Sequence, residues 1–449
     1  MSLAAGAPTL TVGAWLGAAL VGVALGVAAA LSLEHALAGA VVLVALYALA
    51  RAQLRSELVL AAFWVTFCVY ETIFSSVTVP GLFYPFYAAF ALAVMVSLLR
   101  RGVAVEAWGL WLYGGFLFVV LLAFLGFTEP VGFEVAQRVF AYAFGLLVML
   151  QIGTRRGVRP VLVAALCAGV AIAVWVIAAS AQAGFRYRGD VSVDQNVASF
   201  FIGFGVLVAL AFAVDLMRRR HARLTLLLAL VPLAAMLYAM TLLASRGIAI
   251  ALTLGVLAII ARAAMLDVRT LRVALLLLPL SAGAALLPGG DHLLERFALA
   301  DTETGNERLP IWAVTSDAFT RGDVYELLLG HGFGSSQVVV QRASGSLTST
   351  HNAFLQILFE FGVVGFALFV ALHALLIVRA FRLGGGSGLA LFGWMWYLLG
   401  ANLSLNTPDG FLYWTALGVA LSLGRWREAP TAPPPQATRP TRHSALTAP

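Results

Sequence analysis

Apolar runs long enough to cross a membrane recur along almost the whole chain, and they restrict what it can fold into. Of its 449 residues, 61% are hydrophobic and 11% are charged, whereas a soluble globular protein is roughly 45–50% apolar and about 25% charged. A run of about 18 apolar residues or more predicts a transmembrane helix. The chain is therefore predicted to be an all-α, polytopic membrane helical bundle with about 12–14 transmembrane helices.

The pattern divides the chain into four parts. Residues 1–287 are expected to form transmembrane helices with short loops, the first of them a retained span and not a signal peptide. Residues 288–350 are the one long polar interval, which cannot lie in hydrocarbon and so predicts a loop on one face of the membrane. Residues 351–424 return to transmembrane helices. Residues 425–449 are rich in proline and predict a disordered cytoplasmic tail.

Individual spans follow from the apolar runs, although the shortest, 36–50, is doubtful as a span. The expected spans are about 11–33, 36–50, 58–79, 80–99, 106–127, 137–153, 160–182, 197–216, 224–243, 247–264, 270–287, 352–378, 388–405 and 410–424.

The basic residues give an orientation. The net charge of +7 is carried by arginine alone, and most arginines fall after even-numbered spans. The positive-inside rule then places both termini in the cytoplasm and turns the 288–350 loop outward. The same rule explains the charge without a nucleic-acid partner. Cys68 and Cys167 lie inside apolar runs, which argues against a disulfide or metal framework.

One candidate site lies before the span that begins near residue 197. Arg186 and Arg188 flank Tyr187, and Asn196 stands at the head of the span. Guanidinium groups bind phosphate oxygens in a bidentate manner, and helix N-termini attract anions. An arginine–aspartate pair that only fixes a short loop explains the motif equally well.

A second arginine interrupts the apolar stretch from Leu224 to Ile260. Ser245-Arg246-Gly247 is expected to form a tight turn close to the membrane surface, with Ser245 capping the next helix. An arginine at such depth is costly unless it has a partner, which favours a functional role such as pyrophosphate binding. Snorkelling to lipid headgroups is the alternative.

The long loop has its own helix and glycine signals. Arg308 before Pro310 predicts a helix start. Leu327 to Gly334 is read as a loop, because Gly330, Gly332 and Gly334 permit unusual backbone angles. His331 in this loop is expected to be a surface or packed residue.

His351 is the strongest candidate for a catalytic residue. It stands beside Asn352 at the start of an apolar helix. The positive helix end and nearby arginines would keep the imidazole neutral near pH 7, as a general base requires. Glu360 is out of phase with His351 and should face away from it. Glu71 and Glu360 are buried acids, either functional, protonated or paired with an arginine. Asp409 belongs to an outward turn.

The order of several motifs resembles the O-antigen ligase and polymerase superfamily. These motifs are Arg308 and Trp312, then Gly330, Gly332 and Gly334, then His351-Asn352, then Glu360 to Gly365. Tyr187-Arg188-Gly189 with Asn196, and Ser245-Arg246-Gly247, resemble two other motifs of that group. Each patch alone is weak, and the specificity lies in their combination on one side of the membrane.

The resemblance implies a C-class glycosyltransferase-like bundle in a Gram-negative inner membrane, with its active site facing the periplasm. Its donor would be O-antigen on undecaprenyl pyrophosphate, and its acceptor a sugar hydroxyl of lipid A–core. His351 would be the catalytic base, Arg188 and Arg246 would bind the pyrophosphate, and Arg186, Arg308, Asn352 and Asn196 would be accessory. No cofactor or metal is implied, and the oligomeric state stays open.

Four alternatives remain. An O-antigen polymerase or a protein O-oligosaccharyltransferase of the same superfamily would use the same donor. A transporter of lipid-linked glycans should instead carry polar residues at mid-membrane in both halves. A membrane scaffold without chemistry leaves unexplained why Arg246 interrupts an apolar run.

Overall fold

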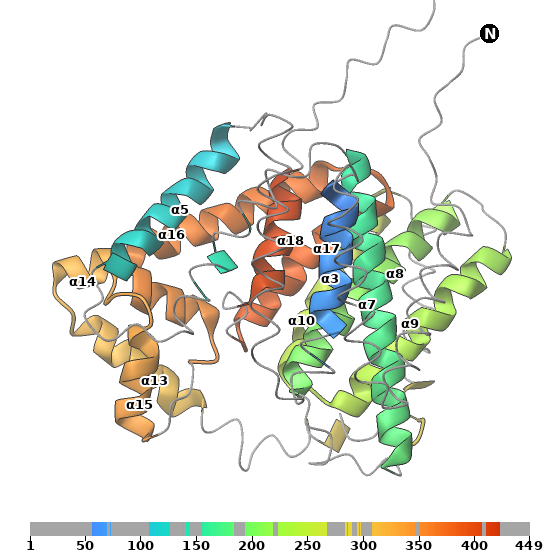
Figure 1. Cartoon of the computed structure of the whole chain (residues 1–449), viewed down its shortest axis with the longest axis horizontal. Helices are drawn as coiled ribbons and strands as arrows, with labels where there is room; N and C mark the ends of the chain where they lie inside the picture. Colours follow the sequence, from blue (N-terminus) through green and yellow to red (C-terminus); the bar gives the residue numbers. More distant parts are fainter. Residues whose placement is uncertain are drawn as a thin grey trace, which may run out of the picture.

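The computed structural model is an all-α polytopic membrane protein (Figure 1). It describes residues 56–69, 72, 107–125, 138, 141–142, 145, 155–183, 194–218, 223–266, 283–284, 286–289, 294–295, 297, 308–345, 350–405 and 410–422. Within these ranges the helices are α3 (Ser56–Val69), α5 (Ala107–Leu125), α7 (Arg155–Gln182), α8 (Gln195–Arg218), α9 (Arg223–Leu243), α10 (Arg246–Leu266), α13 (Arg308–Thr320), α14 (Val324–Leu329), α15 (Ser335–Ser344), α16 (Ala353–Arg382), α17 (Gly385–Asn402) and α18 (Phe411–Leu421).

Several helices are long and apolar enough to cross a bilayer. Among the described residues these are Val158–Gln182, Gln195–Met217, Arg246–Leu266 and Ala353–Arg382. The predicted spans 160–182, 197–216, 247–264 and 352–378 coincide with them to within a few residues. The predicted spans 11–33, 36–50 and 80–99, most of 137–153 and of 270–287, and the tail 425–449 lie outside the described residues.

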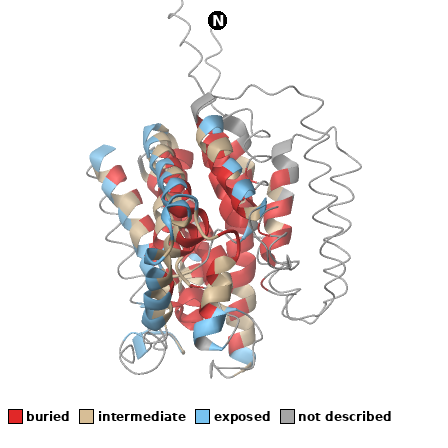
Figure 2. Cartoon of the chain, turned by 90° about the vertical axis from the view of Figure 1, so that its left-hand side faces the viewer, coloured by how far each residue is buried: buried red, intermediate tan, exposed pale blue. Residues whose placement is uncertain are grey.

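The core of the bundle is built from α3, α7, α8, α9, α10 and α17. Trp64 of α3 stacks on Trp394 of α17, and Phe204 of α8 meets both rings edge-on. Gly255 of α10 lies against Gly393 of α17, where an added Cβ would come within 3.0 Å of the Gly393 carbonyl. Small residues of this kind let membrane helices pack at short distance. Figure 2 shows the buried residues concentrated inside the bundle.

A second group of helices, α5, α16 and α18, packs beside the core. His373 of α16 bonds through Nδ1 to the Phe369 carbonyl at 2.9 Å, so Nδ1 carries the proton. Its Nε2 then accepts from the Tyr413 hydroxyl of α18 at 2.5 Å. Asn402 of α17 donates to the same hydroxyl at 3.0 Å. This buried network satisfies its polar groups and joins α16, α17 and α18 inside the bundle.

The predicted polar loop 288–350 is largely helical where it is described. α13, α14 and α15 lie together at the lower left of Figure 1, beside the first half of α16. α13 begins at Arg308 with Pro310 in its first turn, as the sequence predicts. The prediction that Leu327–Leu329 belong to a loop is wrong. They form the end of α14, because Asp323 and Glu326 make a capping box that starts a helix there.

Candidate functional site

The first element of the site is the start of α8. The Asp194 carboxylate accepts hydrogen bonds from the backbone N–H groups of Asn196 at 2.8 Å and Val197 at 3.3 Å. It thereby satisfies two of the amides that a helix start leaves without a partner. The cap fixes where α8 begins and leaves the Asn196 side chain available for a neighbouring helix.

That neighbour is the start of α10. The Ser245 hydroxyl donates to Asn196 Oδ1 at 2.8 Å, so the side chain that was expected to cap α10 joins α10 to α8. Arg246 is the first residue of α10 and is half-buried. Gly247 lies against the turn that follows α17, where an added Cβ would come within 2.3 Å of the Ser404 Oγ. The Ser-Arg-Gly turn therefore needs glycine for close packing.

The second half of the site is the turn before α16. Thr350 is fully buried, and its hydroxyl donates to the Asn352 carbonyl at 3.1 Å. Asn352 caps α16 through Oδ1, which accepts from the Leu355 N–H at 3.1 Å. His351 between them has φ +49°, a left-handed conformation that is uncommon for a residue with a side chain. Such a backbone persists only where its surroundings hold it.

α13 provides the contact that keeps His351 in this backbone conformation. The Trp312 indole N–H donates to the Thr350 carbonyl at 2.8 Å. Arg308 lies one helical turn before Trp312, on the same face of α13, and its charge acts on His351. One face of α13 therefore both fixes the His351 turn and sets its electrostatic environment.

His351 is held toward its neutral form. Its pKa is lowered from 6.5, first by burial and then by the Arg308 guanidinium, while the Asp194 carboxylate opposes the shift. An imidazole with a lowered pKa is unprotonated near pH 7 and can accept a proton. The sequence predicted the effect of nearby arginines, but it gave no role to Asp194.

These contacts bring four helix starts together. Hydrogen bonds join α8 to α10 through Asn196 and Ser245, and α13 to the α16 turn through Trp312. The two pairs are close enough for the Asp194 carboxylate to act electrostatically on His351. Each helix start carries partial positive charge from its backbone N–H groups. Together with Arg246 and Arg308 they make an edge suited to an anionic ligand beside a neutral imidazole.

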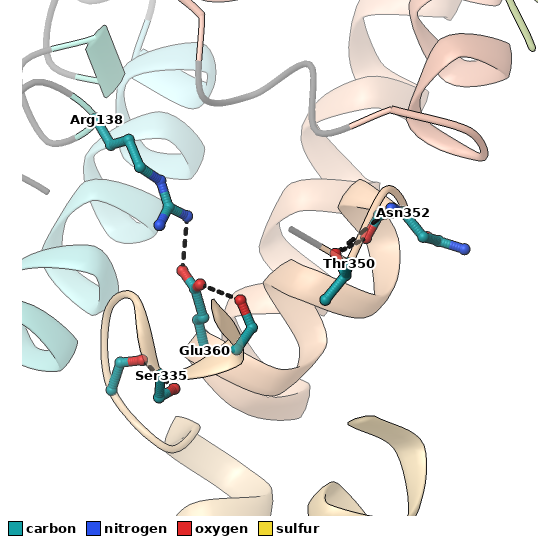
Figure 3. Close-up of polar contacts among 7 residues, drawn as sticks. Arg138, Ser335, Thr350, Asn352 and Glu360 are labelled. Atoms are coloured by element: carbon teal, nitrogen blue, oxygen red, sulfur yellow. Dashed lines mark hydrogen bonds and ion pairs between the residues drawn. The ribbon is translucent and has the colours of Figure 1, made fainter. Parts of the chain in front are cut away.

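Glu360 lies in a separate buried cluster, away from this edge (Figure 3). Its carboxylate pairs with Arg138 at 2.9 Å and accepts from the Ser336 hydroxyl at 2.6 Å. The Arg138 guanidinium also stacks over the Phe333 ring at 4.6 Å. Of the readings that the sequence left open for Glu360, pairing with an arginine is the one observed. The partner is 222 residues away, so no local pattern pointed to it.

The glycine loop packs on α16 next to this cluster. Gly330, Gly332 and Gly334 have φ values of 88°, 97° and 80°, as their spacing predicted. The His331 ring stacks on Phe359 with centroids 4.2 Å apart, so His331 is the packed residue that the sequence favoured.

Other predicted site residues are not described. Arg186, Arg188, Glu71 and Asp409 lie outside the described residues. Within the described ranges, no group of three or more His, Cys, Asp or Glu residues is placed to hold a metal ion.

Comparison with known proteins gives one finding. Residues 231–370 match a family model described as O-antigen ligase. The matched stretch includes Arg246, Arg308 and His351, and it ends before His373. No curated protein matches the chain.

Proposed function

We propose that the chain is a ligase of the O-antigen ligase and polymerase superfamily, because residues 231–370 match the O-antigen ligase family model. In this proposal it transfers O-antigen from undecaprenyl pyrophosphate to a sugar hydroxyl of lipid A–core. The reaction takes place at the periplasmic face of a Gram-negative inner membrane and completes lipopolysaccharide.

The observation that carries the proposal is the meeting of the starts of α8, α10, α13 and α16. It places Asn196 and Arg246 on two helix ends joined by one hydrogen bond, and Arg308 and His351 on two helix ends joined by another. The Asp194 carboxylate acts electrostatically on His351 between the two pairs. A general base and anion-binding groups at one membrane edge are the parts that glycosyl transfer from a lipid pyrophosphate needs.

Arg246 and Arg188 bind the donor pyrophosphate, with Arg186 and Asn196 as accessory residues. A guanidinium offers a planar fork of donors that matches phosphate oxygens. The amides at the start of α10 add further positive potential. Pyrophosphate is already a good leaving group, so the arginines absorb the developing charge without a metal.

His351 activates the acceptor. Its neutral imidazole removes the proton from the acceptor hydroxyl as the oxygen attacks the anomeric carbon. A new glycosidic bond forms, the bond from that carbon to the pyrophosphate oxygen breaks, and undecaprenyl pyrophosphate leaves as the anion. The proton stays on His351 until water removes it. Asn352 and Arg308 support this step by fixing the turn and by keeping the imidazole neutral.

In-line attack of this kind inverts the anomeric carbon. Determining the anomeric configuration of the donor and of the product linkage by NMR tests this step. A retained configuration would reject direct displacement.

Reconstitution tests the function. The full-length protein in liposomes is given an undecaprenyl-pyrophosphate glycan with lipid A–core, with a second molecule of donor, or with a protein acceptor. A ligase forms the lipid A–core conjugate, whereas a polymerase lengthens the lipid-linked glycan. Movement of donor across the bilayer without a covalent product would replace the proposal by the transporter reading.

Two variants connect the product to the site. His351→Ala should abolish transfer while the protein remains folded and membrane-inserted. His331→Gln is the matched control, because His331 packs on Phe359 away from the helix starts, and it should retain most of the activity. Equal loss in both variants would remove the assignment of His351.

A further inference from the structure

α14 presents an apolar face to its surroundings, although it lies in the polar interval of the sequence. Val324, Tyr325, Leu328 and Leu329 are 67%, 77%, 46% and 44% exposed. At 100° per residue these four positions fall on one side of the helix, and Glu326 points away from them. Glu326 is held by the capping box with Asp323, and its carboxylate lies 3.7 Å from His331 Nε2.

The depth of α14 follows from its contact with α16. Gly362 interrupts α16 with φ +65°, and an added Cβ there would lie 2.4 Å from the Leu328 backbone. An added Cβ on Gly330 would lie 2.2 Å from the Glu360 carbonyl oxygen. The backbones of α14 and α16 therefore touch at residues 360–362.

Residues 360–362 lie at one boundary of the hydrocarbon. α16 ends at Arg379 and Arg382, which belong at the opposite, cytoplasmic surface. About 20 residues of helix cover the roughly 30 Å hydrocarbon core. Counted back from Arg382, this length ends close to Gly362. α14 is thus positioned at the level where acyl chains meet headgroups.

The exposed face of α14 continues the lipid-facing surface of its neighbours. Val363 and Val364 of α16, next to the contact, are exposed apolar residues, and so is Leu125 at the end of α5. The glycine loop that follows α14 reaches α5 through the Phe333 N–H, which donates to the Ala123 carbonyl at 3.2 Å. Figure 1 draws α14 at the left edge, beside the ends of α5 and α16.

We propose that α14 is an interfacial helix whose Val324, Tyr325, Leu328 and Leu329 side chains insert among the acyl chains of the outward leaflet. A short helix with one apolar face lies in the interface plane, with that face about 5–10 Å into the headgroup and acyl boundary. The tyrosine hydroxyl suits this level, since Tyr is enriched at membrane–water interfaces. The anchor would hold the α13–α15 segment at the bilayer surface, and it does not depend on which reaction the site performs.

Site-directed fluorescence tests the insertion. Cys68 and Cys167 are both buried and are replaced by alanine in the full-length protein. Tyr325→Cys or Leu328→Cys then receives an environment-sensitive label in phosphatidylcholine–phosphatidylglycerol liposomes. Lipids brominated near the head of the acyl chain should quench both labels more strongly than lipids brominated near its end.

Two labels calibrate the result. Val370→Cys, an exposed position inside the α16 span, should show the reverse order of quenching. Asp317→Cys, on the exposed side of α13, should not be quenched by either lipid. Labels at 325 and 328 that behave like the one at 317 overturn the proposal. Labels that neither lipid quenches, but whose emission changes with the protein-to-lipid ratio, also overturn the proposal, because a second copy of the protein then covers this face of α14.

Discussion

At the residue scale, His351 is the most sensitive position, because two opposite charges act on it. Burial and then the Arg308 guanidinium lower its pKa from 6.5, and the Asp194 carboxylate raises it. In the proposed mechanism transfer needs the unprotonated ring, so activity should rise with pH through the pKa of His351, and half-maximal activity should fall below the pKa of a free histidine.

Arg308→Gln and Asp194→Asn should move the acidic limb of the pH–activity profile in opposite directions. Loss of Arg308 removes a positive charge, so the pKa of His351 rises and the limb moves to higher pH. Loss of the Asp194 charge lowers that pKa and moves the limb to lower pH. Transfer rates of the reconstituted protein between about pH 4.5 and 8 measure both shifts. Shifts of the same sign would contradict the electrostatic assignment.

A substitution at Arg246 separates the effect of the guanidinium's planar shape from the effect of its charge. Arg246→Lys keeps the charge but loses the planar fork, and we expect a fall in transfer of about 10- to 100-fold. Arg321→Lys is the control, because Arg321 is exposed and paired with Asp317 at 2.8 Å in α13. Wild-type transfer rates in both variants would contradict the proposal that Arg246 binds phosphate oxygens in a bidentate manner.

At the scale of elements, α13 positions the His351 turn through one hydrogen bond. Trp312→Phe removes the bond to Thr350 and keeps most of the ring area. A bond of this kind contributes about 0.5–1.5 kcal/mol, which corresponds to roughly 2- to 12-fold. The loss should fall on kcat, with KM for the donor unchanged. A change in KM alone would assign Trp312 to substrate binding instead.

The Arg138–Glu360 ion pair joins residue 138 to α16, and the Arg138 guanidinium also covers the Phe333 ring of the glycine loop. Both side chains are buried, at 5% and 0% exposure. Glu360→Gln removes the anion beside a buried guanidinium, and losses of about 3–5 kcal/mol are typical of a broken buried pair. The midpoint of thermal unfolding in detergent should fall clearly. Arg138→Met with Glu360→Leu should recover part of the loss, and no recovery would mean that the pair is not the source.

The local signals differ in how far they could predict these elements. α8 and α10 follow from apolar runs, and α13 follows from Arg308 and Pro310. α14 was missed because a six-residue helix gives no periodic signal, although the Asp323–Glu326 spacing of a capping box was readable. Arg138 and Glu360 come from distant segments, and only the packing of the bundle brings them together.

At the scale of the whole molecule, the sequence predicted which helix ends share a side. Asn196 meets Ser245 at one end of the bundle, and Arg262 bonds to the Leu383 carbonyl at the other. Which end faces the cytoplasm stays a prediction from the positive-inside rule.

Reporter fusions test that orientation. Alkaline phosphatase fused after Pro449 should be inactive, and green fluorescent protein fused there should fluoresce, as expected for a cytoplasmic terminus. A membrane-impermeant maleimide should label Asp317→Cys, in a background without Cys68 and Cys167, from the periplasmic side of intact cells. Labelling only after the inner membrane is broken would reverse the orientation and remove the proposed donor from its reach.

The four joined helix starts have a consequence for biosynthesis. Asp194 and His351 are far apart in the order of translation, and the turn that holds His351 is made only when α13 and α16 are both in place. A ribosome-bound chain that has inserted α8 and α10 has anion-binding groups but no base. On the proposed function, acceptor activation would therefore begin only after the segment that carries α13 and the start of α16 has been inserted.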